Sequence, residues 1–145
     1  MKKTISLILL ILWIVIIFVL SNQTGSVSKS QSNIIVKSLY NIVNTDEHTL
    51  ILIVRKSAHI LEYLILYLLT YNRFKKHNKN KKFIFVIFCL LCSITDEIHQ
   101  LFIIERTGKV IDIFIDSIGI ALGFIIIEVT YGKKKKVKKD SSQKN

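Results

Sequence analysis

Four long apolar stretches run along the chain and are separated by polar segments. The first, residues 5–20, contains a single polar side chain, Ser6. About 17–25 apolar residues in a helix are needed to cross the hydrocarbon core of a bilayer. We therefore expect spans at about 4–21, 50–71, 83–102 and 110–131. The pattern predicts an all-α membrane protein, a bundle of four transmembrane helices within a domain of residues 1–131.

Residues 31–44 show a different pattern. Apolar residues recur at helical spacing here, and polar residues occupy most of the opposite side. The stretch is too short and too polar to cross a membrane, so it predicts a short extracytoplasmic amphipathic helix at the membrane surface or capping the bundle. The basic start and apolar run also suit a signal peptide. No small-residue cleavage motif follows, so an uncleaved first span is favoured.

Composition and charge agree with this picture. Half of the 145 residues are hydrophobic and the mean hydropathy is +0.43, which disfavours a small soluble domain. The net charge is +11, and fifteen of the 21 Lys and Arg residues lie within 1–3, 73–82 and 133–144. Short basic flanks stay in the cytoplasm, so both termini are predicted there, with residues 132–145 forming a disordered basic tail. Nucleic acid is not an expected partner; the lipid bilayer is.

A dense set of polar residues interrupts the last two spans. Between Thr95 and Gly123 the chain carries Asp96, Glu97, His99, Gln100, Arg106, Asp112 and Asp116. The second span adds Arg55, Lys56, His59 and Glu62. At about 1.5 Å per helical residue, Glu62 lies near the midplane of a ~30 Å core, and Asp96, His99 and Asp116 lie beyond it. We therefore expect one polar site in the outer half of the bilayer.

Helix periodicity places several of these residues on common faces. Asp112, Asp116, Gly119 and Gly123 lie at i, i+4, i+7 and i+11 of the last span. The Gly-x-x-x-Gly spacing lets membrane helices approach closely. Gly119 and Gly123 are therefore predicted packing residues, within the bundle or in a dimer; the oligomeric state stays open.

The charges of the site do not balance. Three basic residues face five acidic ones, which leaves a charge of −2 when the histidines are neutral. Ionised groups in hydrocarbon are costly unless they are paired or hydrated. Histidine protonation, a carboxyl proton or a bound cation would each relieve the excess.

Two segments resemble the signature motifs of the VanZ-like family of small bacterial membrane proteins. They are RKSAHILEYLILYLL and TDEIHQLFIIERTGKVIDIFIDSIGIALG, and the polar SNQTGSVSKS linker is also similar. Ile104-Glu105 stands where the family often has Pro-Gly, and Asp116 stands where many members have Asn. The resemblance implies a multi-pass protein of the bacterial plasma membrane and a link to resistance against the glycopeptide teicoplanin. It implies no established reaction.

Three functions remain open. The first is an enzyme or binding site for a lipid-linked cell-envelope intermediate or a glycopeptide. Its candidate catalytic residues are Glu62, His59, Asp96, His99 and Asp112, and its candidate ligand-binding residues are Arg55, Lys56, Glu97, Gln100, Arg106 and Asp116. The second is a divalent-metal site, for zinc or manganese, on His59, Glu62, Asp96 and His99. The third is a non-catalytic accessory protein held together by an interhelical charge network.

Overall fold

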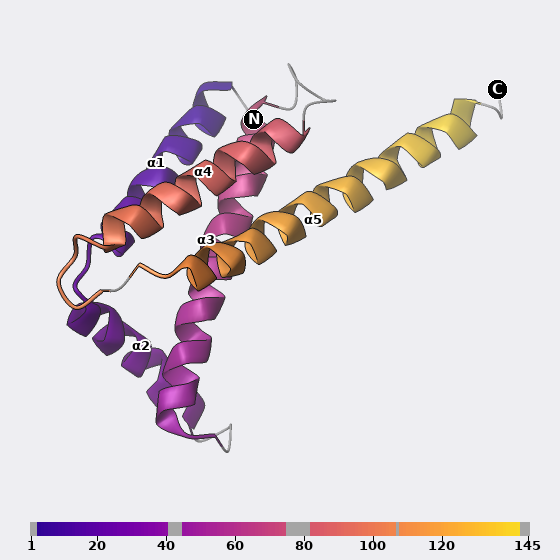
Figure 1. Cartoon of the computed structure of the whole chain (residues 1–145). Coiled ribbons are helices and arrows are strands. Elements are labelled where there is room, and N and C mark those ends of the chain that lie inside the picture. Colours follow the sequence, from indigo (N-terminus) through magenta and orange to yellow (C-terminus); the bar gives the residue numbers. More distant parts are fainter. Residues whose placement is uncertain (1–2, 41–44, 75–81, 107, 143–145) are drawn as a thin grey trace.

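The computed structural model describes residues 3–40, 45–74, 82–106 and 108–142, and these residues form five α-helices and no strands. They are α1 (Lys3–Ser21), α2 (Gly25–Tyr40), α3 (Glu47–Phe74), α4 (Lys82–Gln100) and α5 (Val110–Ser142). Figure 1 shows α1 and α4 side by side, α5 crossing α3 obliquely, and α2 against the N-terminal half of α3. The all-helical prediction is confirmed.

Three helices are long and apolar enough to cross a membrane, within Thr4–Ser21, Lys82–Gln100 and Val110–Thr130. The helix α3 has 28 residues, but the charged residues Arg55, Lys56 and Glu62 near its middle lower its hydropathy. The predicted count of four spans therefore rests on three clear helices and one charged helix. Because α3 contacts all four other helices, it is the central element of the fold.

Two element boundaries differ from those predicted. The helix α2 begins at Gly25, inside the segment expected to be a linker, and residues 41–44 of the predicted amphipathic helix lie outside the described residues. The helix α5 continues to Ser142, where a disordered tail was expected from residue 132. Lysine is a good helix former and no proline interrupts the run, so the helical backbone can continue past the apolar segment.

The core lies where α1, α3, α4 and α5 meet. Its fully buried centre contains Tyr63, Leu66 and Tyr67 from α3, Cys89 from α4 and Ile120 from α5. A second, smaller apolar cluster joins α2 to the N-terminal half of α3, through Val36, Leu50 and Ile51. This second cluster holds the amphipathic helix beside the end of the bundle that carries the polar residues.

Polar side chains at two helix ends form stabilising contacts. The side chain of Asp46 accepts a hydrogen bond from the backbone N–H of Thr49 at 2.8 Å, which caps the start of α3. The hydrogen bonds from Thr49 lower the pKa of the Asp46 carboxyl. At the opposite end of the bundle, Lys82 at the start of α4 forms an ion pair with Glu128 of α5.

The closest helix approach is between α3 and α5. A Cβ atom at Gly119 would lie 2.2 Å from the carbonyl oxygen of Ile60, and one at Gly123 would lie 2.9 Å from the ring of Tyr67. Both glycines therefore face α3 inside the chain. The backbone of α5 could not pack as it does with larger residues at these positions.

We predict that Gly119→Ala destabilises the protein by about 1–3 kcal/mol. The added methyl group would clash with the backbone of α3 at Ile60, which cannot move away as a flexible side chain can. Gly123→Ala is the matched control, since its nearest contact is a side chain, and its loss should be smaller. Thermal unfolding of the purified protein in detergent measures both. Equal effects of the two substitutions would contradict the assigned packing.

Candidate functional site

The polar residues gather where α1 and α4 end and α5 begins. A polar cavity of about 160 Å³ lies there between α1, α2, α3, α4 and the loop that follows α4. Six of the predicted site residues line it: Arg55, His59, Glu62, Asp96, Gln100 and Arg106. Serine and glutamine side chains of α1, α2 and the connection between them, including Ser21, Gln23 and Gln31, complete the wall.

A second cavity, of about 140 Å³, adjoins the polar cavity and is the more basic of the two. Its lining includes Arg55, Lys56, Arg106 and Lys109, with Asp112 and Glu105 as the acidic residues. Lys56 lies 3.8 Å from Asp112 and forms an ion pair with it. Arg55, His59, Gln100 and Arg106 line both cavities, so these four residues lie between them.

The basic residue Arg106 is held by the loop between α4 and α5. Its Nη2 donates to the carbonyl oxygen of Leu20 at 3.0 Å, and its Nε is buried without a hydrogen-bond partner among the described residues. Burial, and then the nearby charge of Arg55, lower the pKa of Arg106 from its usual value. Neither arginine forms an ion pair within the part of the chain that the structure describes. Both guanidinium groups are therefore available to an anion.

His59 and Asp116 form the buried centre beside the cavities. His59 Nδ1 lies 3.1 Å from Asp116 Oδ1, and Ser93 donates to Asp116 Oδ2 at 2.5 Å. Asp116 is completely buried. A carboxylate hydrogen-bonded to one ring nitrogen orients the imidazole and leaves the other nitrogen for a second partner.

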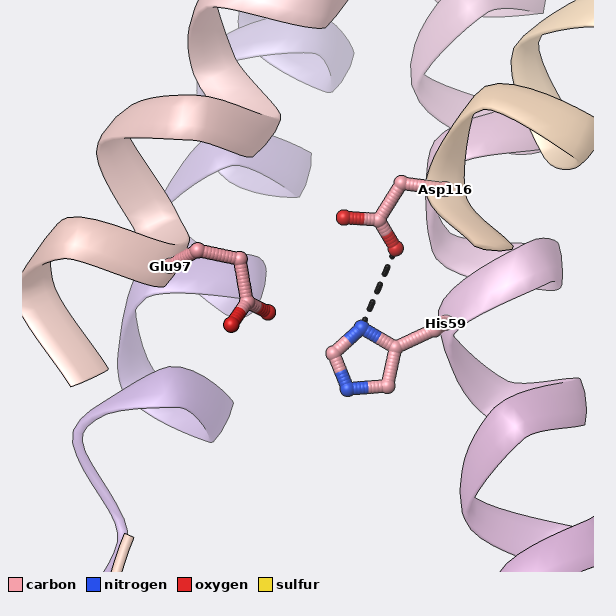
Figure 2. Close-up of side chains that lie close together, drawn as sticks. All are labelled: His59, Glu97 and Asp116. Atoms are coloured by element: carbon pink, nitrogen blue, oxygen red, sulfur yellow. Dashed lines mark hydrogen bonds and ion pairs between the residues drawn. The ribbon is translucent and has the colours of Figure 1, made fainter. Parts of the chain in front are cut away.

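Glu97 approaches this pair from α4. Figure 2 shows the side chains of His59, Glu97 and Asp116 pointing toward one another from three helices. Candidate ligand atoms of the three residues all lie within 4.8 Å of one another. Glu97 Oε2 accepts a hydrogen bond from the backbone N–H of Lys109, while its buried Oε1 has no partner among the described residues.

The remaining predicted residues are placed as follows. Gln100 donates to Asp96 at 3.0 Å, which holds that carboxylate at the wall of the polar cavity. His99 lies apart from both cavities: its ring stacks on Phe18 with centroids 5.0 Å apart, and its Nε2 lies 3.3 Å from Asn22. Among the described residues, the group whose candidate ligand atoms lie within 4.8 Å of one another is His59, Glu97 and Asp116, and it shares only His59 with the predicted metal set.

The loop after α4 determines where Arg106 lies. Gly108 packs on the carbonyl of Glu97, and Glu105, at φ 61°, has a left-handed backbone. The Glu105 side chain accepts a hydrogen bond from Ser26 N–H at 3.0 Å, and Gly25 N–H donates to the carbonyl of Ile104. The loop is therefore held against the start of α2. This contact also positions Arg106, the residue that follows Glu105 in the chain.

A family model for VanZ/LLP1 matches residues 6–131, which include every residue of the site. The chain belongs to the VanZ/LLP1 family. No curated protein and no solved structure matches it. The Arg-Lys-x-x-His-x-x-Glu segment of this VanZ-like chain lies near the middle of α3, and the Asp-Glu-x-His-Gln segment ends α4.

Sequence reasoning did not assign a role to two residues that contact the site of this VanZ-like chain. Ser93 binds Asp116, and Trp13 donates from its indole nitrogen to the carbonyl oxygen of Glu62 at 3.0 Å. Ser93 shares a helix face with Asp96 and Gln100, a signal that could have included it. The contact of Trp13 has no signal in the sequence, because it joins residues 49 positions apart.

We predict that His59→Ala and Asp116→Ala each destabilise the protein by about 3–5 kcal/mol, because each leaves a buried polar partner unpaired. The double variant should lose less than the sum, by an interaction energy of about 0.5–3 kcal/mol. Unfolding in detergent measures the cycle. Asp116→Asn keeps an oxygen for Ser93 and should be the mildest change; strictly additive losses would contradict a coupled pair.

Proposed function

We propose that this VanZ-like protein binds a lipid-linked component of the cell envelope by its anionic headgroup, in the polar cavity and the basic cavity beside it. The observation that carries the proposal is the pair of arginines, Arg55 and Arg106, which lie between the two cavities without an ion pair in the described structure. A guanidinium binds phosphate or carboxylate through two parallel hydrogen bonds. A headgroup phosphate would give both arginines the partner they lack.

The acidic side of the polar cavity supplies the second half of the recognition. Glu62 of α3 and Asp96 of α4 line it together with the two arginines. Carboxylates accept hydrogen bonds from hydroxyl or amino groups. A headgroup that combines a phosphate with hydroxyl groups, as sugar-linked and glycerol-linked lipids do, is complementary to both sets of residues.

The position of the site suits such a ligand. The cavity residues lie at the ends of α1 and α4, two of the helices that are apolar enough to cross a membrane. The basic flanks favour an orientation with both termini in the cytoplasm, which puts this end of the bundle at the outer leaflet.

This orientation predicts that a reporter protein fused after residue 145 lies in the cytoplasm, so a reporter that is active only in the cytoplasm should be active. Activity of a reporter that works only outside the cell would reverse the orientation.

We predict that Arg106→Gln lowers the retention of phosphatidylglycerol by the purified full-length protein at least about tenfold, since charge-assisted hydrogen bonds contribute about 1.5–3 kcal/mol each. Native mass spectrometry with phosphatidylglycerol and phosphatidylcholine of identical chains measures the retention. The wild-type protein should prefer phosphatidylglycerol, whose glycerol hydroxyls can bind Glu62 and Asp96. Equal retention of the two lipids would refute the headgroup proposal.

Lys37→Gln is the matched control, because Lys37 is an exposed basic residue of α2 that lines neither cavity. It should leave the lipid preference unchanged.

The family resemblance suggests a consequence in cells, a contribution to glycopeptide resistance. Expression of the wild-type chain should then raise tolerance to teicoplanin, and Glu62→Gln or Arg106→Gln should remove this effect at unchanged protein levels in the membrane.

A second candidate function is a divalent-cation site on His59, Glu97 and Asp116. The three ligand atoms lie within 4.8 Å of one another, and Glu97 Oε1 is buried without a described partner. One imidazole and two carboxylates suit zinc or manganese, and the cation would offset the negative charge of the cluster. Lys56 and Arg55, close by, oppose it electrostatically.

Elemental analysis of the protein after exposure to zinc or manganese tests this second function. About one ion per chain is expected for the wild type and clearly less for Glu97→Gln. Glu47→Gln, which changes an exposed carboxylate at the start of α3, should bind as the wild type does. No ion retained by the wild type would dismiss the metal site and leave headgroup binding unaffected.

A further inference from the structure

A third hollow lies between α1 and α4, on the side of the polar cavity that faces the membrane. This α1/α4 groove measures about 420 Å³ and is lined mainly by apolar side chains: Ile14, Ile17, Phe18, Leu66, Phe88 and Leu91. Phe18 and Leu91 are more than half exposed, at 55% and 57%. Since α1 and α4 are both membrane-length helices, the mouth of the groove lies among lipid chains.

One end of the groove is polar. Tyr63, Thr95, Asp96 and His99 line it beside the apolar residues. Tyr63 is completely buried, and its hydroxyl has no hydrogen-bond partner among the described residues. Buried tyrosine hydroxyls normally have a partner, because an unpaired one keeps its desolvation cost. The groove therefore offers a hydrogen-bond donor to an occupant that carries a polar atom at this end.

The groove and the polar cavity share two wall residues. Ile17 of α1 and Asp96 of α4 line both spaces, so the two are adjacent at this point. A molecule with a polar head and an apolar chain could therefore occupy both spaces. The arginines would contact its head, Tyr63 the linkage and the groove its chain.

We propose that the α1/α4 groove binds one hydrocarbon chain of the lipid whose headgroup occupies the polar cavity, and that Tyr63 donates a hydrogen bond to an oxygen of the linkage between chain and head. The identity of the headgroup rests on the proposed function above. The walls shared with the polar cavity and the unpaired Tyr63 hydroxyl support the groove independently of that headgroup. It makes the site laterally accessible from the bilayer.

The size and lining of the groove favour a lipid chain over a helix of a second copy. An apolar cavity of about 150 Å³ accommodates benzene, so 420 Å³ has room for a longer piece of hydrocarbon. A packed helix would bring side chains to the whole length of the groove, and its backbone carbonyls, already paired within the helix, would not be free to accept from the Tyr63 hydroxyl. A single chain that ends in a polar linkage satisfies both parts of the lining.

Photocrosslinking tests the proposal with the full-length protein in phosphatidylcholine vesicles. The probes are trace amounts of phosphatidylglycerol and of phosphatidylcholine, each with a diazirine in the same acyl chain. Crosslinked residues are mapped by mass spectrometry. We expect labelling of groove positions such as Phe88 and Leu91 to exceed that of Leu122, an exposed residue of α5 outside the groove, by about fivefold.

Three variants sharpen the readout. Leu91→Trp fills the groove from an exposed position and should reduce groove labelling severalfold, whereas Leu122→Trp, the matched control, should not. Tyr63→Phe removes only the unpaired hydroxyl. It should lower groove labelling about threefold while the thermal stability of the lipid-free protein is kept or increased; a loss of stability instead would assign the hydroxyl a structural role and overturn its part in the proposal.

The outcomes separate the groove from the headgroup site. Labelling spread evenly over all exposed apolar positions overturns the groove, even if Arg106→Gln still abolishes the lipid preference. Groove labelling that is strong and equal for both probes supports the groove and refutes the anionic headgroup instead. A crosslink between two chains at Phe88 or Leu91 would show a second copy in the groove and overturn the proposal.

Discussion

The close approach of α3 and α5 is the contact on which the site depends. Gly119 brings its backbone against the carbonyl of Ile60, one residue after His59, and Gly123 lies beside Leu64 and Tyr67. The two obliquely crossing helices run in the same direction here, because residue numbers increase together along the contact. One turn before Gly119, Asp116 therefore reaches His59 at 3.1 Å. A wider separation of the helices would remove this pair, since side-chain hydrogen bonds tolerate little change in distance.

Burial of charge imposes the second constraint. Each of the deeply placed acids except Glu62 has a partner that the structure describes: Asp116 binds His59 and Ser93, Asp96 accepts from Gln100, and Glu97 accepts from Lys109 N–H. The two arginines are not neutralised in this way. Their charge is therefore directed at the cavities, where a ligand rather than a side chain can balance it.

Residues 101–106, which follow α4, connect the polar site to helix α2. Glu105 adopts a left-handed backbone, which costs a non-glycine residue about 1–3 kcal/mol. Its carboxylate binds the N-terminal end of α2, where negative charge is favourable. A glycine at position 105 would adopt this backbone without strain. Because the loop is bound to the start of α2, this helix closes one side of the polar cavity.

The sequence by itself determined the helical class, the long apolar segments and the positions of the polar residues along them, because periodicity and the 1.5 Å helical rise are local properties. It also indicated that Asp116, Gly119 and Gly123 share one face. Only the tertiary structure decided which residues meet: Glu97 rather than His99 joins His59 and Asp116, Ser93 completes that group, and Trp13 holds the backbone of Glu62. These contacts depend on how α1, α3, α4 and α5 rotate and cross. The rotation and crossing of the helices result from packing between segments that are distant in the sequence, and a local pattern of residues does not predict such packing.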